Sequence, residues 1–204
     1  KHSDVVILCL GLDETLEGEE GDTGNSYASG DKETLQLPEV QRDLMKAVAE
    51  CGKPVILCLM AGSDIDLSFA REHFDAILDL WYPGSQGGAA AARVLFGDVS
   101  PSGKLPVTFY ETLEELPEFT DYHMEGRTYR YMKQDALYPF GYGLSYTTYA
   151  YSNLTVRGEQ VGEDGTDITV TVKNTGKRTG TETVQVYIKI EKEDTPNAQL
   201  KAIR

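Results

Sequence analysis

The sequence is poor in the residues that build disulfide frameworks, histidine-based catalytic centres and nucleic-acid-binding surfaces. It holds three cysteines and three histidines among 204 residues. Lysine and arginine number 19 against 33 aspartates and glutamates, which gives a net charge of −14. Such a balance repels DNA, RNA and acidic membranes, so we expect no nucleic-acid and no membrane partner. No apolar run approaches the roughly 20 residues that a membrane-spanning helix needs.

The cysteines show neither the spacing of a metal site nor an even number for disulfides. Cys9, Cys51 and Cys58 include no C-x-x-C pair. Cys9 and Cys58 lie inside apolar runs, where a reduced cysteine behaves as a small hydrophobic residue. This pattern favours a reducing, cytoplasmic environment over an oxidising one.

The first part of the chain alternates short apolar runs with helical patterns, as globular α/β proteins do. Apolar runs at 4–10, 54–60 and 75–80 predict strands, and helical patterns cover residues 38–51, 67–74 and 88–96. Continuous apolar runs are typical of parallel strands that are covered on both faces. The sequence therefore predicts a three-layer α/β/α sandwich with a mostly parallel sheet over residues 1–150.

The pattern changes to period two near the end of the chain. Ile168, Val170 and Val172 alternate with polar residues, which predicts antiparallel strands over residues 151–204. So few strands cannot close a β-sandwich, so we expect only part of one. Residues 111–136 show no clear period and predict mostly loop. Because the chain begins at Lys1 and enters a strand pattern at once, we interpret it as a piece of a longer chain.

The loop after the first predicted strand is the best candidate for chemistry. In open α/β sheets, ligands bind beyond the carboxyl ends of the strands. Crowding raises the pKa of the most buried acid, and an acid that stays protonated near neutral pH can act as a general acid. A solvated acidic loop is the alternative interpretation. The loop contains six carboxylates: Asp13, Glu14, Glu17, Glu19, Glu20 and Asp22.

Other chemistries fit the sequence only in part. A calcium loop beginning at Asp13 would place Gly24 where the EF-hand requires a bidentate glutamate. A serine hydrolase would need Ser85, in a glycine-rich turn, to meet a histidine base, for which His123 is the candidate. Residues 109–151 are rich in tyrosine and phenylalanine, which either bind sugar rings or pack a junction between domains.

Four motifs, in order along the chain, resemble glycoside hydrolase family 3. Residues 17–19 read EGE and residues 30–32 read GDK, similar to that family's EGEG-x-DR region. The turn at 80–89, LWYPGSQGGA, resembles its W-x-PG-Q-x-G motif. LFGDVSPSGKLPVTF at 95–109 and YPFGYGLSYT at 138–147 are close to its two long signatures. The resemblance covers nearly the whole chain.

This resemblance implies a fold and a reaction. Family members join a (β/α)8 barrel, an α/β/α sandwich and often a fibronectin-III-like domain, to which residues 172–176 and 185–187 are similar. They are retaining, exo-acting β-glycosidases, mostly β-glucosidases and β-xylosidases, and need no metal or redox cofactor. The chain would then hold the sandwich without its opening strands, followed by a truncated fibronectin-III-like domain. The implied partners are a β-linked oligosaccharide or glycoside and the missing barrel.

The resemblance also assigns roles to residues. Glu17 matches the first glutamate of the family's motif and is implied to be the general acid/base, while the nucleophilic aspartate lies on the barrel. Glu19 is a rival, because the family's second Glu-Gly reads Glu-Glu here. Asp31 and Lys32 match the family's Asp-Arg pair and are implied to bind substrate. Extra residues precede this pair, and lysine replaces the arginine.

The missing barrel leads to further expectations. The loop at 11–34 has few apolar anchors, so we expect it to be mobile and Glu17 to be exposed. The chain alone should be inactive, because it lacks the nucleophile. A non-catalytic carbohydrate-binding or scaffolding module is the alternative function. Glucose and xylose are not separated by the motifs, although the extended acidic loop slightly favours xylose.

Overall fold

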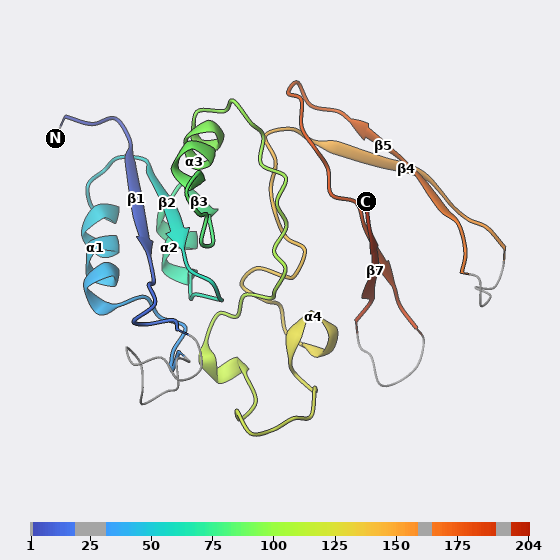
Figure 1. Ribbon diagram of the computed structural model, residues 1–204, viewed down its shortest axis with the longest axis horizontal. Helices are drawn as coiled ribbons and strands as arrows, with labels where there is room; N and C mark the ends of the chain where they lie inside the picture. The colour runs from blue at the N-terminus through green and yellow to red at the C-terminus, as the bar shows by residue number, and fades with distance from the viewer. Residues whose placement is uncertain (1, 19–31, 159–164, 191–196) are drawn as a thin grey trace.

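The computed structural model describes residues 2–18, 32–158, 165–190 and 197–204 (Figure 1). Its first half contains a three-stranded sheet in the order β1 (Val6–Gly11), β2 (Val55–Met60) and β3 (Ala76–Asp79). Both pairings are parallel, with Val6 opposite Val55 and Ile56 opposite Ala76. The predicted parallel and adjacent strands are therefore confirmed.

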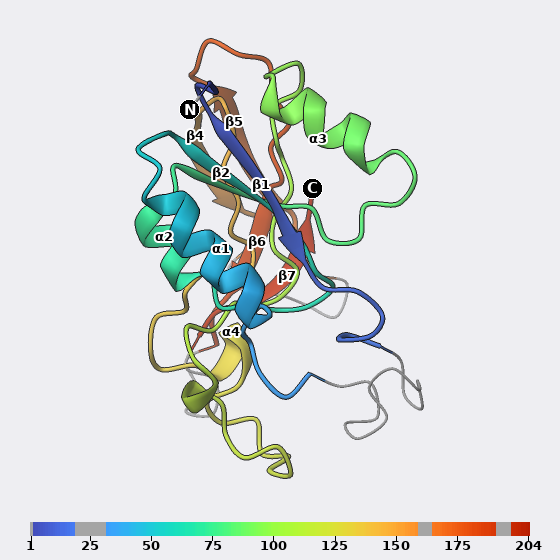
Figure 2. The same cartoon turned by 90° about the vertical axis from the view of Figure 1, so that its left-hand side faces the viewer.

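Helices cover both faces of this sheet, as expected for an α/β layer structure. Figure 2 shows α1 (Glu39–Ala49) and α2 (Ser68–His73) on one face and α3 (Gly87–Leu95) on the other. Helix α1 begins directly after Pro38, whose missing N–H is tolerated at a helix start. Gly52, with φ of 67°, follows the end of α1 and reverses the chain towards β2.

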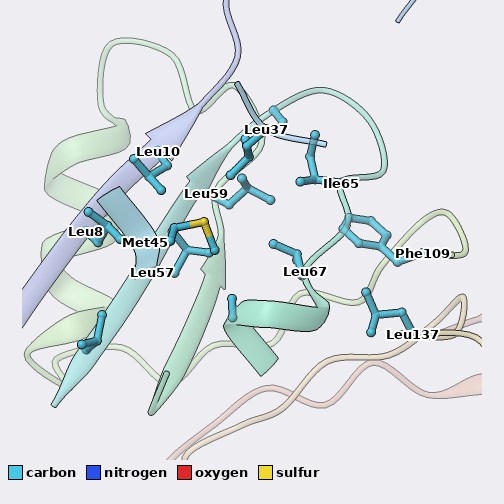
Figure 3. Packing of buried hydrophobic residues seen from close by; sticks show 13 residues of the cluster. Leu8, Leu10, Leu37, Met45, Leu57, Leu59, Ile65, Leu67, Phe109 and Leu137 are labelled. Atoms are coloured by element: carbon cyan, nitrogen blue, oxygen red, sulfur yellow. The ribbon is translucent and has the colours of Figure 1, made fainter. Parts of the chain in front are cut away.

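The hydrophobic core lies between the sheet and the layer formed by α1 and α2 (Figure 3). Leu57 and Leu59 of β2 have no exposed surface, and neither has Ile65, which follows this strand. Phe109, 1% exposed, closes the core from a segment much later in the chain. The central strand is therefore the best-covered element of the domain.

Strand β1 departs from the expectation that its apolar run is covered on both faces. Leu8 and Leu10 are buried in the core, whereas Ile7 is 47% exposed and Cys9 is exposed as well. Strand β1 lies at one edge of the described sheet. One of its faces therefore packs on the core while the other meets solvent, and Cys9 is not the buried residue that the sequence suggested.

The segments that carry the two long sequence motifs run side by side as extended chain. The Leu105 N–H donates to the Tyr142 carbonyl at 2.8 Å, and Phe109 and Tyr138 form an antiparallel bridge. At Gly143 the chains are so close that an added Cβ would overlap a backbone carbonyl of the partner segment. The pairing explains why these stretches are extended, and the close approach explains why residue 143 is a glycine.

The second half of the chain forms two antiparallel ribbons. Strand β4 (Tyr149–Val156) pairs with β5 (Ile168–Asn174), and β6 (Gln185–Ile188) pairs with β7 (Gln199–Ile203). The antiparallel pairing agrees with the period-two pattern. Among the described residues the ribbons are separate two-stranded sheets, so a partial sandwich stays a prediction. The domain boundary expected at residues 150–151 also stays a prediction, and β4 runs across it.

An irregular segment connects the two halves. Between residues 111 and 136 it contains two short helices, η2 (Leu113–Glu115) and α4 (Thr128–Tyr131), within otherwise irregular chain. This agrees with the expected loop. In the described part of the chain, no helix combines the length and the apolar character that crossing a membrane requires.

The position of the core gives a first prediction. Leu57→Ala should lower the free energy of unfolding by about 3 kcal/mol, because it removes a fully buried side chain and leaves a cavity. The same substitution at Leu154, which is 68% exposed, should change it by less than about 0.5 kcal/mol. Urea unfolding followed by circular dichroism compares the two. Equal losses would contradict a core placed over β2.

Candidate functional site

Segments that follow all three parallel strands converge on one glutamate. Glu17 lies in the loop after β1, Gly62 and Ser63 follow β2, and Tyr82 follows β3. The Gly62 N–H and the Tyr82 hydroxyl donate to Glu17 Oε2 at 2.7 and 2.5 Å. The Ser63 hydroxyl donates to Oε1, and Lys32 Nζ lies 4.0 Å from the same oxygen. Parallel strands end at one sheet edge, which is why these distant residues meet.

A tight turn fixes Glu17 just beyond β1. The backbone carbonyl of Asp13 accepts the N–H groups of Leu16 and Glu17 at 3.0 and 2.9 Å. The Asp13 carboxylate accepts the N–H and the hydroxyl of Thr15 at 3.0 and 2.6 Å, which is an Asx turn. The start of the acidic loop is thus ordered by its own hydrogen bonds.

A strained turn after β3 directs Tyr82 to Glu17. Trp81 has φ of 53°, a left-handed conformation that is rare for a large side chain. The Trp81 N–H donates to Asp79 Oδ1 at 3.2 Å, which helps to hold this conformation. Gly62 lies against the tyrosine ring, because an added Cβ there would come within 2.8 Å of Tyr82 Cε2. Only glycine leaves room for the ring to reach Glu17.

The electrostatic surroundings of Glu17 favour its carboxylate form. Burial works to raise its pKa, since only 15% of the side chain is exposed. The hydroxyls of Ser63 and Tyr82, the Gly62 N–H and the Lys32 ammonium together outweigh burial and lower the pKa of Glu17 below its ordinary value. In this chain Glu17 is therefore ionised at neutral pH.

Two expectations about Glu17 are wrong. It is not exposed, because the ends of β2 and β3 supply donors that hold it against the sheet edge. Its pKa is lowered and not raised, because among the described residues the groups that act on it are hydrogen-bond donors and Lys32. Residues 19–31 of the acidic loop, including Glu19 and Asp31, lie outside the described residues, and the expected mobility of the loop stays a prediction.

Lys32, the remaining residue expected at the site, is held beside Glu17 by Asp64. Lys32 Nζ donates to the Asp64 backbone carbonyl at 2.6 Å, and burial lowers the pKa of Lys32. The Asp64 carboxylate accepts the Tyr110 N–H at 2.8 Å, and burial raises the pKa of Asp64 to about 6. Asp64 therefore links the lysine to the segment that closes the core.

Sequence reasoning did not identify four of these residues, namely Gly62, Ser63, Asp64 and Tyr82. The available signal is topological, because a loop and a turn that follow two parallel strands leave the same edge of the sheet. The hydrogen bond between Tyr82 and Glu17 confirms that proximity.

The alternative chemistries receive no support from the described residues. His123 is 93% exposed and contacts Asp121, and no hydrogen bond joins it to Ser85 in the part of the chain that is described. Within the same residues no group of three or more His, Cys, Asp and Glu side chains could hold a metal ion. Tyr129 and Phe140 stack with ring centroids 4.3 Å apart, which favours packing over a sugar platform at this pair.

Comparison with known proteins decides the family. The model of the glycosyl hydrolase family 3 C-terminal domain matches residues 1–146. The chain belongs to glycoside hydrolase family 3. The resemblance seen in the four motifs is therefore confirmed for the domain that carries Glu17.

The family 3 relatives include a β-xylosidase and β-glucosidases. The chain is 46% identical over 202 residues to a xylan 1,4-β-xylosidase of Xylanibacter ruminicola, covering 98% of this chain and 23% of that protein. It is 37% identical to a periplasmic β-glucosidase of Salmonella typhimurium, covering 92% and 25%. The solved structure of a β-glucosidase from Erythrobacter marinus matches all of this chain and 27% of its own, with TM-score 0.84 and 37% identity. The chain spans about a quarter of the length of these family 3 proteins.

The buried carboxyl group beneath Trp81 gives a second prediction. Burial raises the pKa of Asp79 to about 6, and its Oδ2 has no hydrogen-bond partner among the described residues. A carboxyl whose folded-state pKa exceeds its unfolded value stabilises the fold at low pH, and this contribution is lost as pH rises through about 6. Asp79→Asn keeps an oxygen for the Trp81 N–H and removes the titration. The stability of the Asp79→Asn variant should therefore fall less than that of the wild type between about pH 4 and pH 7.

Thermal unfolding at a series of pH values measures this difference. Asp121→Asn is the control, because Asp121 is exposed and hydrogen bonds from His123 lower its pKa. Asp121→Asn should not weaken the pH dependence of stability in this way. Identical pH dependence in Asp79→Asn and the wild type would show that Asp79 does not titrate as its burial implies.

Proposed function

We propose that this chain supplies the general acid/base of a retaining β-glycosidase, with Glu17 in that role. The observation that carries the proposal is the convergence of donors from the ends of β2 and β3 on one carboxyl group at the carboxyl edge of the sheet. Such contacts fix both the orientation and the proton affinity of the group, which a proton-transfer catalyst requires. They favour an enzyme over a non-catalytic binding or scaffolding module, which has no need to fix either.

The proposed reaction has two steps. An aspartate on a (β/α)8 barrel attacks the anomeric carbon while Glu17 donates a proton to the leaving oxygen. Glu17, now a carboxylate, then takes a proton from the water that releases the sugar. The lowered pKa of Glu17 in this chain suits the second step. For the first step, the barrel's carboxylate at about 5 Å would raise the pKa of Glu17 by like-charge repulsion.

The barrel is the proposed partner of this chain in a longer enzyme. In support, the chain spans about a quarter of the length of its relatives. We propose β-linked glucosides or xylosides as substrates, since the relatives include a β-xylosidase and a β-glucosidase. Asp31 and Lys32 remain proposed substrate-binding residues and Glu19 the rival acid/base. The β4–β7 ribbons are proposed to begin a fibronectin-III-like domain. The mechanism uses no metal or redox cofactor.

Replacing Glu17 tests this function in a full-length enzyme that contains the chain. Glu17→Ala should lower kcat/KM for xylobiose or cellobiose about a thousandfold, because their leaving groups need protonation. Activated aryl glycosides should lose far less, and added azide should partly restore their turnover. Steady-state kinetics with both substrate types measures the contrast.

Two further variants complete the comparison. Glu14→Ala removes an exposed acid of the same loop and should leave both substrate types unaffected. Glu19→Ala tests the rival. If both substrate types fell equally in Glu17→Ala and azide had no effect, Glu17 would not be the acid/base, and the same pattern should then be sought in Glu19→Ala.

A further inference from the structure

We propose that Tyr82 is a positioning residue that, together with the Gly62 N–H, occupies Glu17 Oε2 and leaves Oε1 as the oxygen that exchanges the catalytic proton. The inference rests on the proposed function of Glu17 and specifies which atom performs it.

The two oxygens of Glu17 have different numbers of donors. A carboxylate oxygen has about two acceptor positions. Oε2 receives the Gly62 N–H at 2.7 Å and the Tyr82 hydroxyl at 2.5 Å, so both of its positions are filled. Among the described residues, only the Ser63 hydroxyl donates to Oε1, and Lys32 Nζ at 4.0 Å is beyond hydrogen-bonding distance. One acceptor position therefore stays open, and it is on Oε1.

Tyr82 remains a donor throughout the working pH range. Burial, together with the hydrogen bond to ionised Glu17, raises the pKa of Tyr82 to about 12. The Gly62 N–H cannot lose its proton either. A proton arriving at Glu17 therefore finds Oε2 blocked by two fixed donors and binds Oε1.

The backbone around Tyr82 keeps its hydroxyl in place. The left-handed conformation of Trp81, held through its N–H by buried Asp79, directs the next residue towards the sheet edge. Gly62 lies against the other side of the tyrosine ring, where an added Cβ would come within 2.8 Å of it. Backbone strain of this kind is typical of functional sites, because the surrounding structure must maintain it. Here the strain at Trp81 helps to fix the position of the Tyr82 hydroxyl.

Both proton transfers then take place at one atom, Glu17 Oε1. In the first step the Oε1–H bond breaks as the proton moves to the glycosidic oxygen, while the barrel aspartate bonds to the anomeric carbon and the leaving group departs. In the second step the water oxygen bonds to the anomeric carbon as its proton moves to Oε1, and the bond between that carbon and the aspartate breaks. Oε2 keeps the same two donors in both steps.

Tyr82→Phe in the full-length enzyme tests the inference. The variant loses one donor to Oε2, so the charged form of Glu17 is less stabilised and the pKa of Glu17 should rise. Because a general acid works in its protonated form, the high-pH limb of kcat/KM for xylobiose or cellobiose should move up by about one pH unit. With the proton free to occupy either oxygen, kcat for these substrates should fall about tenfold. Activated aryl glycosides should lose less.

Further variants separate this effect from general damage. Tyr151→Phe removes a hydroxyl that donates to Glu182 at 2.7 Å, outside the site, and should keep the wild-type pH profile. Gly62→Ala displaces the Tyr82 ring from its other side and should move the limb in the same direction.

The outcomes distinguish the two proposals. If Glu17→Ala shows azide rescue but the high-pH limb of Tyr82→Phe stays where it is in the wild type, the role of Tyr82 is overturned and the proposed function stands. If Glu17→Ala shows no rescue, the proposed function fails and the assignment of Oε1 fails with it.

Discussion

The hydrogen bonds to the Glu17 carboxylate are the interaction on which the candidate site depends. A carboxylate that is only 15% exposed is costly unless donors replace the water it has lost. These donors come from Gly62, Ser63 and Tyr82, which follow two other strands. The site therefore requires β1, β2 and β3 to run parallel, because only then do their loops share an edge.

The site is surrounded by groups that cost the fold stability. Trp81 adopts a strained backbone conformation, and burial raises the pKa of both Asp64 and Asp79 to about 6. The fully buried leucines of β2 lie directly before this edge and supply apolar burial that tolerates such costs. Strained residues cluster at functional sites, where the surrounding structure maintains them.

Glu17 is ionised in this chain, which spans about a quarter of the length of its relatives. A retaining glycosidase needs a second carboxyl group at about 5 Å, and that neighbour raises the pKa of the acid/base. The proposed function therefore divides the work between two parts: this chain would orient the proton carrier, and the proposed barrel would supply the charge that raises its pKa.

The sequence alone determined the parallel sheet, the order of its elements and the location of the acidic loop, because apolar runs and helical periods reflect burial directly. It also singled out Glu17, through motif resemblance. The tertiary structure decided the state of Glu17, since Gly62, Ser63 and Tyr82 lie 45 to 65 residues away along the chain. It also decided that Cys9 is exposed, which depends on β1 being an edge strand. Local sequence patterns encode which residues are buried, whereas a pKa and a proton position depend on atoms that only the fold brings together.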